Sequence, residues 1–154
     1  MSIAIGPVLH PAHLISDLRT RRRDSALGEL SRQAERARAA REPELLRATL
    51  LLRERLGSTA VGRGVAVPNA RSLLVAEPVL LVGRSARGIE WGAADGELVH
   101  VVLLVLSPAG TCIAAHLAAV ARAVAAARRC RARQKLLGGG TPEEVAALLR
   151  GVPA

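Results

Sequence analysis

An apolar run at residues 98–106 constrains the fold of this 154-residue chain more than any other feature. Only His100 interrupts the run, and its residues do not alternate between apolar and polar as they do in a strand with one exposed face. An unalternating run of this kind is typical of a central strand that is covered on both faces. The sequence therefore predicts a sheet with helices packed on both sides, which is an α/β architecture.

Two segments before this run have the spacing of amphipathic helices. Residues 21–41 repeat apolar residues at intervals of three and four and present a basic outer face. The inner positions predicted for this helix are Leu27, Leu30, Ala34 and Ala37. Pro43 suits the first turn of a second helix, and Gly57 is a natural stop for it. The buried stripe predicted for this second helix consists of Leu45, Leu46, Thr49, Leu50 and Leu52.

Two more helices are predicted after the apolar run. Residues 113–129 have a long helical pattern. The inner face predicted for it consists of Leu117, Val120, Val124 and Ala127. Thr141 followed by Glu144 is a capping-box signature, so a short terminal helix is predicted to continue through Leu149.

The region between the second and third helices indicates strands and turns. Residues 65–67 predict a short apolar strand, and Pro68 begins a turn that would present Asn69 and Arg71. Residues 78–84 predict another strand, and residues 88–91 predict its hairpin return. The apolar run then supplies the central strand of the sheet.

The length of the chain fits a single domain, residues 1–154, in which residues 1–18 are the least clearly patterned. Half of the residues are apolar, which argues against disorder, and no run reaches the length of a membrane span. The first residues lack the charged start and apolar run of a signal peptide. We therefore expect a cytoplasmic protein without membrane insertion.

The net charge of +9 suggests nucleic-acid binding as one function, because arginine and lysine neutralise phosphates. Two basic clusters, residues 19–23 and 128–133, would carry this binding. No nucleic-acid motif accompanies the charge, however, and the chain has no Phe or Tyr and a single Trp with which to stack bases. Arginines that occupy solvated helix faces are therefore the interpretation that we favour.

The cysteines and histidines indicate neither a metal site nor a disulfide framework. Cys112 and Cys130 lie far apart and form no CxxC motif. His10 and His13 are separated by a proline and lack a third ligand. We expect no metal and no cofactor.

Residues 53–71 combine small hydroxyls, glycines and arginines around one exposed turn. In one-letter code they read RERLGSTAVGRGVAVPNAR. The end of the second helix would aim Arg53 toward the turn after Pro68, near Asn69. Arginine forks and hydroxyl donors are common anion-binding groups, so this stretch is suited to a site that handles an anion.

This stretch closely resembles the phosphorylation-site region of the enzyme IIA domains of the bacterial phosphoenolpyruvate-dependent sugar phosphotransferase system, in the fructose/mannitol class that includes nitrogen-regulatory members. The family pattern is roughly RExxxSTxxGxGxAxPHxR, and its histidine carries the phosphoryl group. In this chain Asn69 takes the place of that histidine. The resemblance implies one type-2 IIA domain with a mixed β-sheet flanked by helices on both faces. It implies as partners an HPr-like phosphocarrier protein, the membrane component of the system or regulatory target proteins.

The resemblance also assigns roles to individual residues. It maps Asn69 onto the phosphoryl-accepting position and Arg53 onto the arginine beside the phosphoryl group. A second likeness, at residues 111–120, maps His116 onto the histidine that supports the phosphorylated one. The remaining phosphoryl- or anion-binding positions are Ser58, Thr59 and Arg71.

The chemistry of residue 69 decides how much of the family's activity is expected here. Neutral imidazole offers a lone pair that can attack phosphorus, whereas the lone pair of the Asn69 amide nitrogen is delocalised into the carbonyl. Asn69 can still donate and accept hydrogen bonds, so the site can keep its shape. The leading hypothesis is a non-phosphorylatable, regulatory pseudo-phosphocarrier that acts by protein binding.

Two alternatives stay open at this point. In the first, the protein is an active phosphocarrier and His116 is the phosphoryl acceptor. The predicted place of His116 in the first turn of a helix suits a supporting role better, because the helix dipole favours a neutral imidazole there. In the second, the basic clusters bind nucleic acid or an acidic protein. Because these alternatives stay open, the question whether the chain is an enzyme also stays open.

Overall fold

The computed structural model of the protein describes residues 13–129, 138, 141 and 143–144. The strands are β1 (Leu14–Ile15), β2 (Ala60–Gly62), β3 (Val65–Ala66), β4 (Asn69–Ser72), β5 (Val79–Ile89) and β6 (Val99–Pro108). The helices are α1 (Arg23–Arg36), α2 (Pro43–Leu56) and α3 (Ile113–Arg128).

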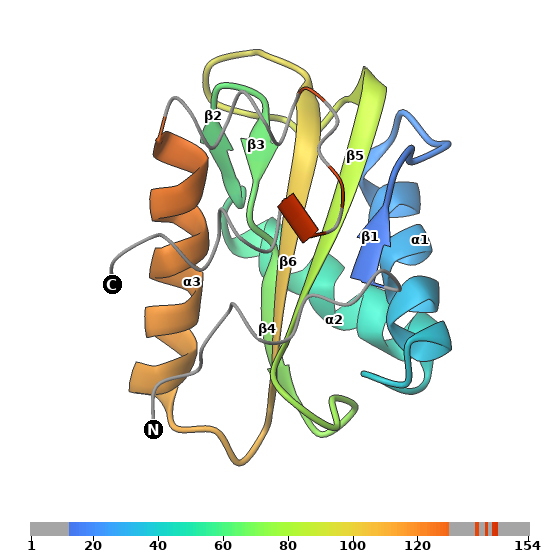
Figure 1. The fold of residues 1–154 in the computed structure, drawn as a ribbon, viewed down its shortest axis with the longest axis vertical. Coiled ribbons are helices and arrows are strands. Elements are labelled where there is room, and N and C mark those ends of the chain that lie inside the picture. Colours follow the sequence, from blue (N-terminus) through green and yellow to red (C-terminus); the bar gives the residue numbers. More distant parts are fainter. Residues whose placement is uncertain (1–12, 130–137, 139–140, 142, 145–154) are drawn as a thin grey trace.

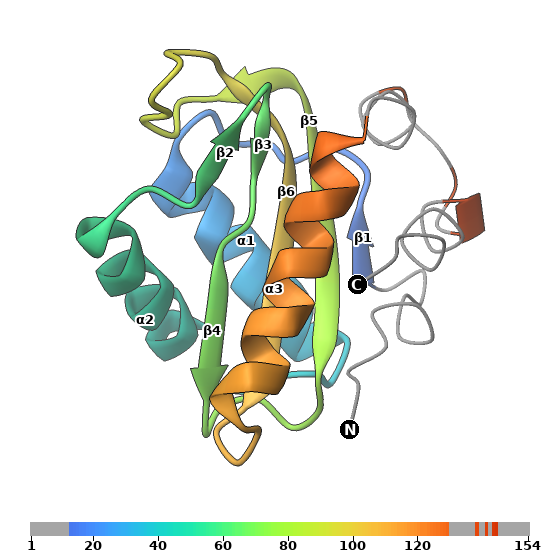
Figure 2. The same ribbon diagram turned by 90° about the vertical axis from the view of Figure 1, so that its left-hand side faces the viewer.

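The six strands form one mixed sheet in the order β1-β5-β6-β3-β2, and β4 also pairs with β6. β5 and β6 are antiparallel, as are β2 and β3. β1 lies parallel to β5, and both β3 and β4 lie parallel to β6. Figures 1 and 2 show α1 and α2 on one face of the sheet and α3 on the other. The predicted α/β architecture, a mixed sheet with helices on both faces, is confirmed.

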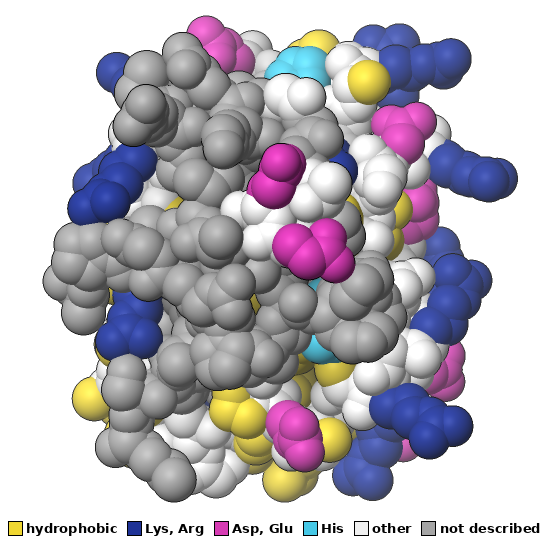
Figure 3. Space-filling view, viewed as in Figure 1, with side chains coloured by type: hydrophobic (Ala, Val, Ile, Leu, Met, Phe, Trp, Pro, Cys, Tyr) yellow, Lys and Arg dark blue, Asp and Glu magenta, His cyan; other side chains and the backbone are white. Residues whose placement is uncertain are grey.

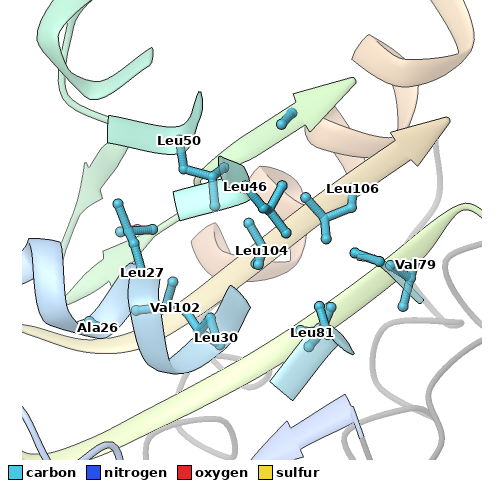
Figure 4. Close-up of a cluster of buried hydrophobic side chains, with 14 of the residues drawn as sticks. Ala26, Leu27, Leu30, Leu46, Leu50, Val79, Leu81, Val102, Leu104 and Leu106 are labelled. Carbon is cyan, nitrogen blue, oxygen red and sulfur yellow. The ribbon is translucent and has the colours of Figure 1, made fainter. Parts of the chain in front are cut away.

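β6 is the central strand that the apolar run predicted. Its side chains alternate between two hydrophobic clusters, one on each face of the sheet. The cluster beneath α1 and α2 contains Val102, Leu104 and Leu106 (Figure 4). The cluster beneath α3 contains Val101, Leu103 and Val105. Both faces of β6 are therefore buried, which is why apolar and polar residues do not alternate along it.

α1 is shorter than the helix predicted over residues 21–41. Arg22 instead forms an isolated bridge with Glu90, and Arg38 has a positive φ of 58°, which ends the helical path. Leu27, Leu30 and Ala34 are buried as predicted, and they belong to the cluster shared with α2. Ala37 lies beyond the end of the helix and is only partly buried.

α2 begins at Pro43 and ends before Gly57 as predicted, but its predicted buried stripe is only partly right. Leu46 and Leu50 are buried, whereas Leu45 and Leu52 are 52% and 60% exposed. The buried face continues from Leu50 to Glu54, in steps of four residues. The buried face is narrow because α2 packs mainly against α1 and makes fewer contacts with the sheet, which it reaches at β4.

α3 turns a face of small residues toward the sheet, so the predicted inner face is only partly right: Ala127 is buried, and Val120 and Val124 are partly buried against the same cluster. Its buried residues are His116, Ala119, Ala123, Ala126 and Ala127. Leu117, which was predicted to be buried, is 56% exposed. Alanines allow the helix backbone to approach β6 closely, so the helix packs through them and leaves Leu117 on its outer side.

The hairpin return predicted at residues 88–91 is wrong, because β5 continues to Ile89 as one strand. The pairing of β5 with β6 shifts in register between Arg84 and Ile89. Gly88 lies in this irregular stretch with a positive φ of 88°, and a Cβ there would come within 2.8 Å of Leu98 Cβ. The chain reverses only after Glu90 and returns as β6.

The turn predicted after Pro68 is a strand. Asn69 and Arg71 lie in β4, which pairs in parallel with the second half of β6. The strand predicted at residues 65–67 corresponds to β3, and it pairs with β2, which the sequence did not predict. Asn69 is therefore fixed by ladder hydrogen bonds at the start of a strand.

Several predictions fall wholly or partly outside the described residues. These are the segment 1–12 with His10, the cluster 128–133 beyond Arg129, Cys130, and the helix through Leu149. The capping box at its start is described and confirmed. The Glu144 N–H donates to Thr141 Oγ1 at 3.2 Å, and the Thr141 N–H donates to Glu144 Oε2 at 3.0 Å.

The basic side chains lie mainly along the margins of the face shown in Figure 3, whereas acidic side chains also lie across its middle. On the face shown in Figure 3, Lys and Arg gather along the two lateral edges, and acidic side chains lie among them on the α1 side. Arg19, Arg21 and Arg22 of the first predicted cluster are exposed. Within the described residues, no helix is both long and apolar enough to span a bilayer.

Candidate functional site

Asn69 and His116 meet although they are 47 residues apart in sequence. Asn69 opens β4, which lies beside β6, and the chain then crosses from the end of β6 into α3. His116 lies in the first turn of α3 and is 4% exposed. Its Nε2 atom is 3.2 Å from Asn69 Oδ1. The structure therefore brings together the two residues that the sequence placed at the centre of the site.

Ser107 is a third member of this site, and the sequence analysis did not select it. β6 continues to Pro108, so Ser107 is a buried strand residue, 1% exposed. Its Oγ lies 2.7 Å from His116 Nδ1. A hydroxyl at the end of an otherwise apolar buried strand is the sequence signal that could have identified it, because a buried polar group needs a partner.

The hydrogen bonds around Asn69 determine which ring nitrogen of His116 carries the proton. The amide Nδ2 of Asn69 donates to the Val67 carbonyl at 3.2 Å, which leaves Oδ1 facing the histidine. Because Oδ1 only accepts, His116 Nε2 must be the protonated nitrogen. Nδ1 of the neutral ring then accepts a hydrogen bond from the Ser107 hydroxyl. Both nitrogens of His116 are thus engaged.

The neutral form of His116 is favoured by its surroundings. Burial, and to a smaller extent the positive charge of Arg71, lower the pKa of His116 below its ordinary value of 6.5. The start of a helix acts in the same direction. The electrostatics therefore favour a neutral imidazole, and the hydrogen-bond pattern is compatible with it.

Stability should depend on pH through His116. In the unfolded chain its pKa is about 6.5, so between the lower folded pKa and about 6.5 the unfolded state binds more protons. The stabilising contribution of His116 is complete above about pH 6.5 and is lost as the pH falls through the folded pKa. Urea unfolding between about pH 5 and 8 should therefore show a smaller decrease on acidification in His116→Gln than in the wild type. An equal decrease in both would contradict the neutral assignment.

The other predicted site residues are held by hydrogen bonds to neighbouring segments of the chain. Arg71 Nη1 donates to the Thr111 carbonyl at 2.8 Å, which ties β4 to the loop before α3. Arg53 Nη1 donates to the Gly57 carbonyl at 3.0 Å, and no hydrogen bond of the described residues joins it to Asn69 or His116. Ser58 is exposed, and its Oγ accepts the Ala60 N–H at 3.2 Å.

Thr59 is bound to Glu54, a residue that the sequence analysis did not select. The backbone N–H of Thr59 donates to Glu54 Oε2 at 3.1 Å, and its hydroxyl donates to Oε1. Both residues are buried, 7% and 4% exposed. The Thr59 carbonyl in turn accepts the Val67 N–H at 2.9 Å. The end of α2 is therefore linked to the segment that leads into Asn69.

A protein-family comparison matches residues 8–151 to a single model, described as the phosphoenolpyruvate-dependent sugar phosphotransferase system, EIIA 2. The chain belongs to this enzyme IIA family. The fold and the motif at residues 53–71 agree with that assignment.

Enzyme IIA relatives match the chain over different lengths. The nitrogen regulatory protein of Bradyrhizobium diazoefficiens is 31% identical over 150 residues, which cover 97% of each protein. The fructose-like EIIA component of Escherichia coli K12 is 52% identical over 52 residues. That match covers 34% of the present chain and 35% of the relative.

Solved enzyme IIA structures share the whole fold. The nitrogen regulatory protein IIA-Ntr of Neisseria meningitidis superposes with a TM-score of 0.85 at 26% identity, covering 94% of this chain and 98% of that one. Enzyme IIA of mannitol from E. coli, in a complex with phosphorylated enzyme IIB, superposes with a TM-score of 0.75 at 19% identity. The latter match covers 91% of this chain and 95% of the other.

Proposed function

We propose that this enzyme IIA family member acts by binding partner proteins and does not relay phosphoryl groups. In this proposal Asn69 stands at the position of the family's phosphoryl-accepting histidine, and His116 stands at that of the supporting histidine. The observation that carries the proposal is the hydrogen bond between His116 Nε2 and Asn69 Oδ1. It keeps an ordered site around a side chain that has no nucleophilic lone pair.

Acceptance of the phosphoryl group by His116 is the less favoured alternative. A histidine can attack phosphorus only through an unprotonated nitrogen. In His116 that nitrogen is Nδ1, which accepts the hydrogen bond of a buried Ser107 hydroxyl. Nε2, which faces Asn69, carries the proton. An attack by His116 would require the ring to leave both hydrogen bonds and its buried position.

The docking surface that we propose is the exposed apolar side of the first turns of α3. Ile113 and Leu117 are 54% and 56% exposed and lie one turn apart, on either side of His116 in sequence. Apolar side chains beside a polar site are typical of the centre of a protein interface. We infer that the partner is an HPr-like phosphocarrier, a IIB-type component or a regulatory target in the cytoplasm. The complex of the mannitol enzyme IIA with enzyme IIB supports this class of partner.

Binding should be insensitive to phosphotransferase treatment. We expect an HPr-like phosphocarrier, titrated by calorimetry, to bind the chain with the same affinity before and after the chain is incubated with phosphoenolpyruvate and the general phosphotransferase proteins and repurified. Leu117→Asp should weaken binding about tenfold or more, because it places a charge at the centre of the proposed interface. Leu45→Asp is the matched control, since Leu45 is 52% exposed on α2.

Two results would contradict the proposal in different ways. A change in affinity after the treatment would show that the wild-type chain is modified, and the non-phosphorylatable function would be wrong. Equal affinities for wild type and Leu117→Asp would show that the docking surface is not on α3.

A further inference from the structure

The outer side of α2 carries an exposed apolar stripe. Leu45, Leu52 and Leu56 are 52%, 60% and 86% exposed. Because an α-helix has about 3.6 residues per turn, these positions lie in one row along the helix, together with Thr49. The row follows the a and d positions of a heptad, which is the pattern of a helix that packs against another helix.

This stripe is distinct from the buried face of α2. Leu46 and Leu50 belong to that buried face and pack in the hydrophobic cluster shared with α1. Each residue turns the helix by about 100°, so the middle of the stripe lies roughly 130° round the helix from the middle of the buried face. α2 therefore has two apolar sides, and packing within the chain covers only one of them.

Leu73 lies near the beginning of α2 and adds to this exposed apolar surface. It is 80% exposed, and its carbonyl accepts a hydrogen bond at 3.4 Å from Nη2 of Arg41, which precedes α2. The described residues include six exposed large hydrophobic side chains, and four of them thus lie on or beside α2. The other two are Ile113 and Leu117 of α3. Exposed apolar side chains gathered in this way mark an interaction site.

The two ends of α2 carry opposite charges, which indicates the kind of partner. Glu44 lies in the first turn, and Arg53 and Arg55 lie in the last turn. In an antiparallel pair of α2 helices, the acidic first turn of each copy would lie beside the basic last turn of the other. The opposite ends of the two helix dipoles would also lie side by side. The stripe and its charges are therefore complementary to a second copy of themselves, related by a two-fold axis.

The spacing of the stripe sets the register of such a pair. When the two-fold axis crosses the middle of the stripe, Leu45 faces the partner's Leu56. In the inner layers Thr49 faces the partner's Leu52. The Thr49 hydroxyl donates to the Leu45 carbonyl at 2.9 Å within the helix. Its burial between the two helices would therefore leave no hydroxyl without an acceptor.

Glu44 and Arg55 lie on the same flank of the stripe, because they are separated by about three helical turns. Arg55 is exposed, and no ion pair among the described residues includes it. The side chain of Glu44 is 72% exposed, and its carboxylate oxygens lie 3.6 Å from Arg32 Nη1 and 3.8 Å from Arg47 Nη1. In the register given above, Arg55 of each copy comes beside the partner's Glu44.

We propose that the protein forms a reversible homodimer through an antiparallel pair of α2 helices. The stripe from Leu45 to Leu56 is roughly 17 Å long. It is short for a standard interface, which buries about 800 Å² on each partner, so we expect a Kd on the order of 10–100 μM. α3 lies on the other face of the sheet (Figures 1 and 2), so its proposed docking surface stays free in the dimer. The inference therefore does not depend on the proposed function.

Sedimentation equilibrium of the purified chain, at concentrations on both sides of the expected Kd, tests the dimer. The average mass should rise with concentration from that of one chain toward that of two. Leu52→Asp should weaken the association about tenfold or more, because it buries a charge in the inner layers of the pair. Leu117→Asp is the matched control, since Leu117 is 56% exposed on α3, and it should associate like the wild type. Urea unfolding of each variant checks that the fold is kept.

A charge exchange tests the antiparallel register. Arg55→Glu and Glu44→Arg should each weaken the dimer about tenfold, because each places like charges together at two symmetric positions. The double variant re-forms both pairs in reverse and should associate within about threefold of the wild type.

Three results would overturn the proposal. A single chain at every concentration would show that the stripe belongs to a different partner or to none. A dimer that Leu52→Asp does not weaken more than Leu117→Asp would show that another surface pairs. A double charge variant that stays as weak as the single variants would contradict the antiparallel arrangement.

Discussion

Asn69→His is expected to convert the chain into a phosphoryl acceptor, from no detectable transfer to about one phosphoryl group per chain. β4 already places the side chain of residue 69 beside His116 Nε2, where Oδ1 of Asn69 lies at 3.2 Å. A neutral imidazole at this position supplies the lone pair that the amide lacks. The Nε2–H of His116, now bonded to Oδ1, becomes available to a phosphoryl oxygen. Transfer of labelled phosphate from phosphoenolpyruvate through the general phosphotransferase proteins measures this gain.

Two further variants test the reason for this gain. Asn69→Gln keeps the amide chemistry and should accept no phosphoryl group. Adding His116→Ala to Asn69→His removes the neighbouring donor and should slow the transfer by about tenfold or more. If Asn69→His is folded, with an unchanged unfolding midpoint, and still accepts nothing, then residue 69 is not at the family's acceptor position.

Glu54→Ala is expected to destabilise the protein by about 3 kcal/mol, the largest effect on stability that we predict for a polar residue. Both carboxylate oxygens of Glu54 are occupied by donors of Thr59, and both residues are buried. Removing the carboxylate leaves the Thr59 N–H and hydroxyl without their acceptor, and each unsatisfied buried group costs roughly 1–3 kcal/mol. Equilibrium unfolding in urea measures the change.

Arg55→Ala is the control for this substitution, because Arg55 is the exposed neighbour of Glu54 in the last turn of α2. Its free energy of unfolding should stay within about 0.5 kcal/mol of the wild type. A cost of less than about 1 kcal/mol for Glu54→Ala would mean that water or a nearby side chain satisfies Thr59, and that the link between α2 and the segment before Asn69 is weak.

The layer order of the fold could be predicted because the central strand has a distinctive composition. The run at residues 98–106 has no polar face, and a strand without a polar face must be covered on both sides. The rotations of α2 and α3 about their axes could not be fully predicted in the same way. The side chain of Leu117 is more apolar than that of an alanine, yet α3 packs through Ala119 and Ala123. The reason is that the distance between a helix and its sheet depends on all the residues in the contact and not on one side chain.

Strand pairing was the other feature that the local pattern did not determine. Residues 88–91 contain the glycine and apolar residues of a hairpin return, but Gly88 instead accommodates an irregular stretch of β5 beside Leu98. Asn69 and Arg71 follow a proline and suggest a turn, yet a free edge of β6 is available to them and they pair with it. In both cases the strand pairing is determined by partners that are distant in the sequence.

The centre of the candidate site was predicted and its supporting residues were not. Asn69 and His116 were selected from a motif, and the structure brings them into contact. Glu54 stands in the quoted family pattern but was given no role, and Ser107 lies outside that pattern, because the importance of both residues comes from burial. Burial also explains the neutral state of His116, since desolvation is the main cause of its lowered pKa.

Intact-mass analysis of the wild-type chain tests the central claim most directly. The chain would be incubated with phosphoenolpyruvate and the general phosphotransferase proteins and kept at alkaline pH, which preserves phosphohistidine, with Asn69→His treated in parallel. We predict that the wild type keeps its unmodified mass while Asn69→His gains one phosphoryl group. An acid-labile phosphoryl group on the wild type that disappears in His116→Ala would contradict the account, because His116 would then be a working acceptor.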